Sequence, residues 1–139
     1  MKENFMGFKP LIALIVILIL TAAYVVGGAD SISKKIEQYT DEHYKKDSVE
    51  YEKYTFMNAT YCNWTAKYDR ALEVLDKYDL LFVKDENREK SEFLRAKTYD
   101  DKIEARKAKD GYKKYIDDFP EGKHIEKARE RYDDLKTYT

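Results

Sequence analysis

Residues 52–82 read EKYTFMNATYCNWTAKYDRALEVLDKYDLLF, and residues 89–119 read EKSEFLRAKTYDDKIEARKAKDGYKKYIDDF. Aligned at an offset of 37 residues, the two stretches share eight identities over 31 positions. The shared pairs are Glu52/Glu89, Lys53/Lys90, Phe56/Phe93, Ala59/Ala96, Ala71/Ala108, Lys77/Lys114, Tyr78/Tyr115 and Phe82/Phe119. An internal period of about 20–50 residues is typical of repeat proteins. The sequence therefore predicts two copies of one structural unit, and Glu126-Lys127 begins a third, truncated copy.

Each copy is predicted to be an antiparallel pair of helices. After Gly28 the only glycine and proline residues are Gly111, Pro120 and Gly122, too few turn residues for a β-protein. Two helices approach closely where their side chains are small, and alanines recur twelve residues apart in each copy: Ala59 with Ala71, and Ala96 with Ala108. These pairs predict the helix crossings. The far end of each second helix is filled by Leu75, Tyr78 and Phe82 or by Tyr112, Tyr115 and Phe119.

One continuous helix over residues 48–82 is the alternative, because no glycine or proline interrupts this segment. Two heptad series run through it, Tyr54, Tyr61, Tyr68, Leu75 and Met57, Trp64, Ala71, Tyr78. Five of these eight seam positions are tyrosine or tryptophan, which suit a coiled-coil seam poorly. We therefore favour the hairpin.

A run without charge precedes the repeats: PLIALIVILILTAAYVVGGA at residues 10–29. About 20 apolar residues cross a bilayer as a helix, so this run predicts a transmembrane helix. With Lys2 and Lys9 ahead of it, the run also fits a cleaved signal peptide, although it exceeds the usual apolar core of about 7–15 residues. Both interpretations place the remainder at a membrane, on the extracytoplasmic side.

A third interpretation concerns Gly7-Phe8-Lys9-Pro10-Leu11-Ile12-Ala13. This junction resembles the processing site of archaeal prepilins, in which cleavage follows a glycine and the apolar helix packs into a filament core. The acidic residue common in bacterial pilins is missing here.

The chain is thus expected to comprise a tail (1–9), a transmembrane helix or signal segment (10–29), a connecting helix (30–47) and a repeat domain (48–139). Residues Ile32, Ile36, Tyr39 and Tyr44 recur at helical spacing, and they predict that the connecting helix runs to about Lys46. Asp47 and Glu50 form a potential capping box. A last helix carries Ile125, Ala128, Tyr132 and Leu135 on one face.

Residues 52 to about 136 resemble the tetratricopeptide repeat family, especially its divergent type in outer-membrane assembly lipoproteins. The resemblance depends on Ala59 and Ala96 in the first helix of each copy, on Tyr68-Asp69-Arg70-Ala71 and Ala108 in the second, and on Tyr112, Tyr115 and Pro120 toward its end. It implies an all-α fold of about two hairpin repeats with a terminal capping helix. The chain departs from the family at Thr55, Asn58, Glu92 and Arg95, which replace large residues, at Val83, which replaces a proline, and in its period.

In that family, peptides bind along a concave face formed by the first helices. The resemblance implies a protein-binding face of Lys53, Phe56, Thr60, Asn63, Lys90, Phe93, Lys97 and Asp100. Phe56 and Phe93 are alternatively buried between hairpins. So few repeats leave apolar surface uncovered unless the flanking helices cap both ends.

The composition and residue spacing argue against nucleic-acid binding, metal binding and enzyme activity. Lysine and arginine number 26 against 27 aspartates and glutamates, so the charge excess of a nucleic-acid-binding protein is missing. His43, Cys62 and His124 lack metal-site spacing, and we expect no metal, no cofactor and no enzyme activity. The acceptor sequons at Asn58 and Asn63 matter only in a glycosylating export route. Acidic neighbours offset Lys107, Lys109, Lys113 and Lys114, which predicts a solvated face.

These features together predict a membrane-anchored adaptor or scaffold. It would serve as an accessory or assembly subunit of a membrane or cell-envelope complex, binding protein partners or further copies of itself and no nucleic acid. The alternative is a pilin-like filament subunit.

Overall fold

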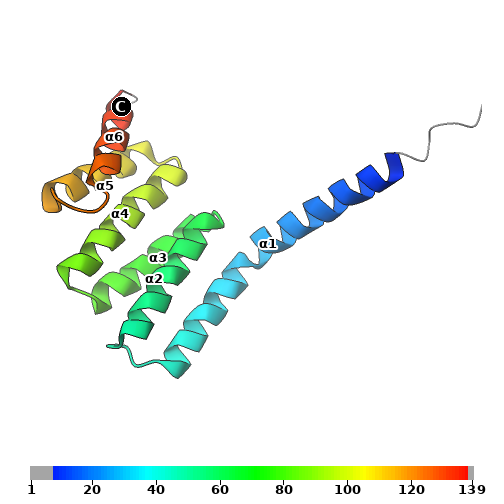
Figure 1. Ribbon diagram of the computed structural model, residues 1–139, viewed down its shortest axis with the longest axis horizontal. Helices are drawn as coiled ribbons and strands as arrows, with labels where there is room; N and C mark the ends of the chain where they lie inside the picture. The colour runs from blue at the N-terminus through cyan, green and yellow to red at the C-terminus, as the bar shows by residue number, and fades with distance from the viewer. Residues whose placement is uncertain (1–7, 138–139) are drawn as a thin grey trace, which may run out of the picture.

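The computed structural model describes residues 8–137, with side chains described at 14–19, 21 and 28–137 (Figure 1). This part of the chain contains only α-helices, so the all-α prediction is confirmed. In chain order they are α1 (Phe8–His43), α2 (Val49–Trp64), α3 (Tyr68–Leu81), α4 (Asp85–Asp101), α5 (Ala105–Asp118) and α6 (Ile125–Lys136).

Each helix from α2 onward packs mainly on the helix before it and the helix after it. The pairs α2–α3 and α4–α5 are antiparallel hairpins, and α3 joins the two by packing on α4 (Figure 1). The chain reverses between Trp64 and Tyr68, so the continuous helix over 48–82 is wrong.

The turns inside the two hairpins have the same backbone conformation. Ala66 has φ 58° and Ile103, 37 positions later, has φ 66°. In the first turn the N–H of Lys67 donates to the carbonyl of Cys62 at 2.8 Å, and the matching N–H of Glu104 donates at 2.9 Å to the carbonyl of Tyr99. A residue in the left-handed conformation at the end of a helix turns the following N–H groups toward the last helical carbonyls, which then have hydrogen-bond donors. It ends α2 and α4 without any glycine.

Small residues let the paired helices approach closely, as the sequence predicts. Ala59, Ala71 and Ala108 are fully buried and Ala96 is almost so. Helix α5 lies close to α4 at Gly111, where an added Cβ would lie 3.0 Å from the Cβ of Ala96. Buried aromatic side chains fill the far ends of the hairpins, among them Tyr78 and Tyr115.

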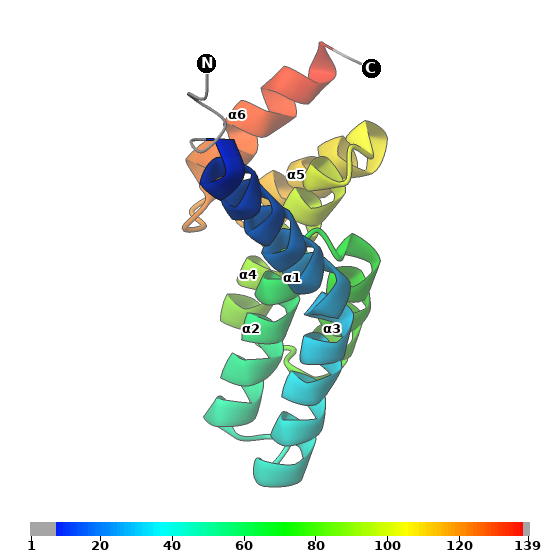
Figure 2. The ribbon, with the colours of Figure 1, turned by 90° about the vertical axis from the view of Figure 1, so that its right-hand side faces the viewer.

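Helix α1 has two distinct halves. Its C-terminal half packs along α2 and contacts α3 through ion pairs of Glu37, whereas its N-terminal half projects away from the other helices (Figures 1 and 2). The apolar side chains of residues 14–19 in the projecting half are all exposed. Searched over its described residues, the protein has no helix with the length and apolarity needed to cross a membrane. The predicted span 10–29 includes residues 10–13, 20 and 22–27, whose side chains lie outside that description.

The docked half of α1 is helical, as the spacing of Ile32, Ile36 and Tyr39 predicts, but these side chains do not define its buried face. The face that packs on α2 and α3 is formed by the buried side chains of Ala29, Ser33 and Thr40, while Ile32 and Tyr39 are exposed. Small residues prevail there because they allow close helix approach. Helix α1 ends at His43, before Lys46. Residues 1–7 of the predicted tail and Gly7 of the prepilin-like junction lie outside the described residues.

The N-cap of α2 is Ser48 rather than Asp47. The hydroxyl oxygen of Ser48 accepts a 3.1 Å hydrogen bond from the backbone N–H of Tyr51. At the opposite end of the molecule, α6 packs on α5 through the buried side chains of Ala128 and Leu135. Helices α1 and α6 therefore cover the two ends of the stacked hairpins.

Candidate functional site

A groove of about 430 Å³ lies between the first helices of the two hairpins. Its walls come from α2, α4 and the segment that leads into α6. The lining residues are Phe56, Thr60, Glu86, Glu89, Lys90, Phe93, Leu94, Lys97, Lys123 and His124. Apolar rings form part of the surface and charged side chains surround them, the composition expected of a site that binds a peptide or small molecule.

The repeat places one phenylalanine from each hairpin in the groove. Phe56 lies against Tyr78, with ring centroids 5.5 Å apart, and Phe93 lies against Tyr115 at 5.4 Å. Tyr78 and Tyr115 are fully buried. Phe93 is itself buried, at 8% exposure, as the alternative interpretation predicts, whereas Phe56 is half-buried. A ligand in the groove would therefore meet mainly the ring of Phe56, which has the fixed ring of Tyr78 behind it.

Two glutamates anchor these tyrosines. The hydroxyl of Tyr78 donates to Glu52, and the hydroxyl of Tyr115 donates to Glu89 at 2.8 Å. Burial, followed by the hydrogen bond to Glu89, raises the pKa of Tyr115 to about 12. Both tyrosines stay protonated at neutral pH and act as hydrogen-bond donors.

Lys90 connects the two repeats across the groove. Its ammonium group lies 4.9 Å from the centroid of the Phe56 ring and 5.6 Å from that of Tyr78. The same nitrogen forms an ion pair with Glu52. A cation over an aromatic face is attracted by the ring quadrupole, so Lys90 is held in place by both repeats.

His124 closes the groove at the α6 end. Its ring stacks on Phe93 with centroids 4.2 Å apart and planes inclined by 15°. Burial, together with the positive charges of Lys123 and Lys127, lowers the pKa of His124 below the ordinary value of 6.5. The imidazole is therefore mostly neutral at pH 7 and adds a flat, uncharged ring to the groove.

The structure brings together Phe56, Thr60, Lys90, Phe93 and Lys97 of the predicted protein-binding face. Lys53 is exposed on α2 outside this lining.

Asn63 and Asp100, which occupy equivalent repeat positions, point elsewhere. Asn63 is buried and donates to Asp101 at 2.8 Å, while Asp100 accepts from Arg131 at 2.9 Å. Each side chain reaches into the next repeat and joins it to its own. Both side chains are engaged in these contacts and lie outside the groove lining.

Sequence reasoning missed half of the lining. Glu89 is part of the repeat pattern, so its 37-residue spacing from Glu52 was a usable signal. Lys123 and His124 come from the connection before α6, and no periodic pattern places such residues. Their position depends on the backbone N–H of Lys123, which donates to Glu89 at 2.6 Å, and on that of His124, which donates to the Tyr115 hydroxyl at 3.0 Å.

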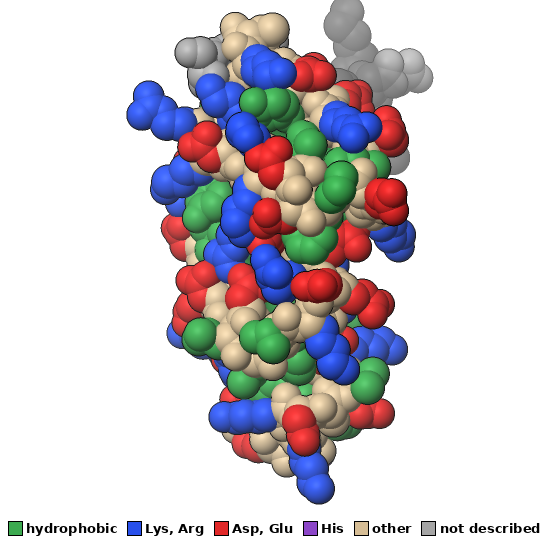
Figure 3. All heavy atoms as spheres, turned by 90° about the vertical axis from the view of Figure 1, so that its left-hand side faces the viewer, with side chains coloured by type: hydrophobic (Ala, Val, Ile, Leu, Met, Phe, Trp, Pro, Cys, Tyr) green, Lys and Arg blue, Asp and Glu red, His purple; other side chains and the backbone are tan. Residues whose placement is uncertain are grey.

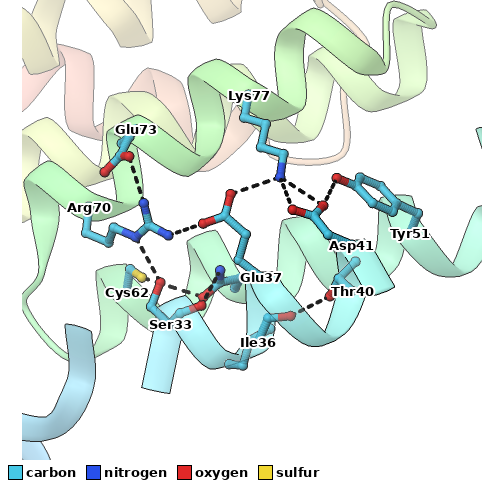
Figure 4. Close-up of polar contacts among 11 residues, drawn as sticks. Ser33, Ile36, Glu37, Thr40, Asp41, Tyr51, Cys62, Arg70, Glu73 and Lys77 are labelled. Atoms are coloured by element: carbon cyan, nitrogen blue, oxygen red, sulfur yellow. Dashed lines mark hydrogen bonds and ion pairs between the residues drawn. The ribbon is translucent and has the colours of Figure 1, made fainter. Parts of the chain in front are cut away.

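A second polar cluster fastens α1 to the first hairpin (Figure 4). Glu37 forms ion pairs with Arg70 and with Lys77, the latter at 2.9 Å. Lys77 also lies 3.2 Å from Asp41, which accepts a hydrogen bond from the Tyr51 hydroxyl. These contacts bring together α1, α2 and α3. The charged and polar groups of this cluster are one another's partners, and together they hold α1 against the first hairpin.

The remaining sequence candidates have structural roles. Asn58, like Asn63, is buried, and its amide donates to the carbonyl of Ser33 at 3.1 Å. Neither sequon asparagine can carry a glycan in this fold. Cys62 is buried, and burial raises the pKa of its thiol. No group of three or more potential metal ligands occurs among the described residues.

The basic stretch of α5 is neutralised by neighbouring carboxylates. Lys107 lies 2.6 Å from Glu104, Lys113 lies 2.5 Å from Asp117, and Lys114 forms an ion pair with Glu92. On the face seen in Figure 3, basic and acidic side chains are interspersed rather than segregated. That face offers no single-sign patch for a phosphate backbone.

Comparisons with known proteins add no relative. A scan against models of protein families matches none, and searches of curated proteins and of solved structures find no match.

Proposed function

We propose that this protein is a membrane-anchored adaptor that holds a peptide segment of another protein in the groove between α2 and α4. The groove is the observation that carries the proposal. It lies on the first helices of two antiparallel hairpins, and its rings at Phe56, Phe93 and His124 provide apolar contacts. The protein would serve as an accessory or assembly subunit of a membrane or envelope complex, without chemistry of its own.

The lining supports a peptide as the ligand. Phe56 and the exposed edges of Phe93 and Leu94 offer contacts to apolar side chains, and Lys123 at the margin can bind backbone carbonyls or a carboxylate. Lys97, also in the lining, is already paired with Asp101. Short peptides commonly bind proteins by placing apolar anchors in such a groove.

The membrane part of the proposal is supported by the uncharged run of residues 10–29 and by the exposed apolar side chains of residues 14–19. Exposed apolar surface of this kind is typical of a contact with lipid or with another protein. The repeat hairpins would then lie on the extracytoplasmic side.

Site-specific crosslinking in native membranes tests the adaptor function. A photoreactive amino acid at Thr60 should capture a partner protein, whereas the same group at Met57, an exposed residue of α2 outside the groove, should not. Thr60→Arg should block the groove and reduce copurification of the captured partner by about tenfold, equivalent to roughly 1.4 kcal/mol.

Met57→Arg is the matched control, because it adds the same side chain to the same helix. Equal capture from Thr60 and Met57, or full copurification with Thr60→Arg, would show that the groove is not the binding site.

A filament subunit is the second candidate, favoured by the exposed residues 14–19 on a projecting helix. In that case the projecting halves of α1 would pack together in a fibre core. N-terminal sequencing of the native protein separates the two functions, since a mature start at Phe8 belongs to a processed filament subunit and an intact Met1 to an anchor.

A further inference from the structure

Three segments meet where the projecting half of α1 begins. These are the start of its docked half at Asp30, the α2–α3 turn and the α4–α5 turn, which line one cavity. The ammonium group of Lys67 lies 3.5 Å from Asp30, and that of Lys102 lies 2.7 Å from Asp69. A shallow cavity of about 220 Å³ is lined by residues from all three segments. We call this end of the molecule the exit face.

Two large apolar side chains on the exit face are almost fully exposed. Trp64, at the end of α2, is 77% exposed, and Ile103, in the α4–α5 turn, is 88% exposed. Ile103 also has φ 66°, a left-handed conformation that is unfavourable for a β-branched residue. Contacts within the described protein do not account for an isoleucine here, and the equivalent Ala66 shows that a small residue serves the turn equally well.

The exit face stands at the boundary of the uncharged run. Asp30 is the first charged residue after residues 10–29, so it would lie at the level of the lipid headgroups if that run were in a bilayer. The ion pair from Asp30 to Lys67 holds the α2–α3 turn at the same level. Tryptophan is enriched at this depth of membrane proteins, where its ring is apolar and its N–H remains hydrated.

We propose that the exit face rests on the membrane, with Trp64 and Ile103 inserted at the boundary between headgroups and acyl chains. This inference depends on the proposed membrane attachment. It adds a second lipid contact, made by the repeat hairpins themselves, which fixes how the hairpins sit on the bilayer.

The charges of the exit face select the kind of lipid. Lys67 is paired with Asp30, and Lys102 is paired with both Asp69 and Glu104. Arg70, the third basic residue that lines the cavity, is paired with Glu37. The basic side chains of the cavity are therefore neutralised within the protein and leave no basic cluster there to attract anionic headgroups. The fitting surface is a zwitterionic bilayer such as phosphatidylcholine.

The test uses Trp64, the single tryptophan of the chain. The full-length protein is reconstituted in phosphatidylcholine vesicles, and its emission is quenched either by iodide in the water or by lipids brominated near the headgroup. The comparison is Trp64→Tyr combined with Val83→Trp, which moves the probe to an exposed position in the α3–α4 turn at the opposite end.

We expect brominated lipid to quench Trp64 but not the probe at position 83, and iodide to quench Trp64 about threefold less than that probe. Ile103→Ser should increase the iodide quenching of Trp64 without changing the helical circular dichroism. Adding phosphatidylglycerol should leave the quenching of Trp64 by brominated lipid unchanged.

The outcomes separate the two proposals. If the protein floats with the vesicles but iodide quenches Trp64 as strongly as the probe at position 83, the exit face does not touch lipid and the anchor stands. A strong increase in the quenching of Trp64 by brominated lipid when phosphatidylglycerol is added would overturn the assignment to a zwitterionic surface. A protein that does not float with vesicles would overturn both proposals.

Discussion

Glu37 and Asp41 attach α1 to the hairpins through charge rather than through apolar contact. Burial by itself would raise the pKa of both carboxyls. The hydrogen bonds and charges of Lys77 and Arg70 at Glu37, and of Tyr51 and Lys77 at Asp41, outweigh burial, so both pKa values lie below the ordinary 4.5 and 3.8. A carboxyl with a lower pKa in the folded than in the unfolded state stabilises the fold above its unfolded pKa. This contribution disappears as the pH falls through the folded value.

Glu37→Gln should therefore weaken the protein more at neutral pH than in acid. We expect its free energy of unfolding to drop by roughly 1 kcal/mol at neutral pH, since a charge-assisted contact is lost. The deficit relative to wild type should shrink as the pH falls below 4.5. Urea unfolding at several pH values measures both effects.

Glu42→Gln is the control, because Glu42 lies exposed on the same helix and its only described contact is a hydrogen bond from Gln38 within α1. A deficit for Glu37→Gln that stays constant with pH would show that the carboxylate charge is not what holds α1.

Single residues were predictable where the repeat fixed them. The period located Phe56 and Phe93 and the alanines at the crossings. It could not show that Asn63 and Asp100 point into the next repeat, since a helical wheel does not include the neighbouring helix. The packing side of α1 was also hidden, because Ser33 and Thr40 carry no apolar signal.

At the scale of elements, the hairpin geometry depends on small residues at the crossings. Ala108 is fully buried between α5 and its neighbours. Ala108→Leu should overpack this contact and lower the free energy of unfolding by roughly 1–3 kcal/mol. Thermal unfolding followed by circular dichroism measures the loss.

Asp110→Leu is the matched control, as it adds the same side chain at an exposed position of the same helix. Ala108→Leu melting at the wild-type temperature would contradict the close crossing of α4 and α5.

Helix number and order followed from the repeat, whereas helix ends followed only in part. The break after Trp64 has no glycine or proline, so the heptad series left a continuous helix open. The alternative fails because Ala66 adopts a conformation in which helices end, as Ile103 does in the second hairpin. Such conformations are not encoded by residue type at these positions. The N-cap was displaced by one residue for a similar reason, since Asp47 and Ser48 are both good caps.

At the scale of the whole molecule, the flanking helices complete the fold. The docked half of α1 covers Tyr51, Asn58 and Cys62, which are buried in the assembled protein. A fragment of residues 30–139 retains this cover and should be a monomer with cooperative thermal unfolding.

A fragment of residues 48–139 lacks α1, and it should unfold at a lower temperature or self-associate, as light scattering would reveal. Equal melting temperatures for the two fragments would show that α1 contributes nothing to the stability of the hairpins.

Helix α1 runs without a break from Phe8 to His43. Its projecting half and its docked half are therefore parts of one continuous helix and change orientation together. A change in the tilt of the projecting half therefore also changes the orientation of the hairpins and of the groove between α2 and α4. A partner would then meet that opening at a restricted height and angle, so orientation rather than contact area would limit which segments can enter.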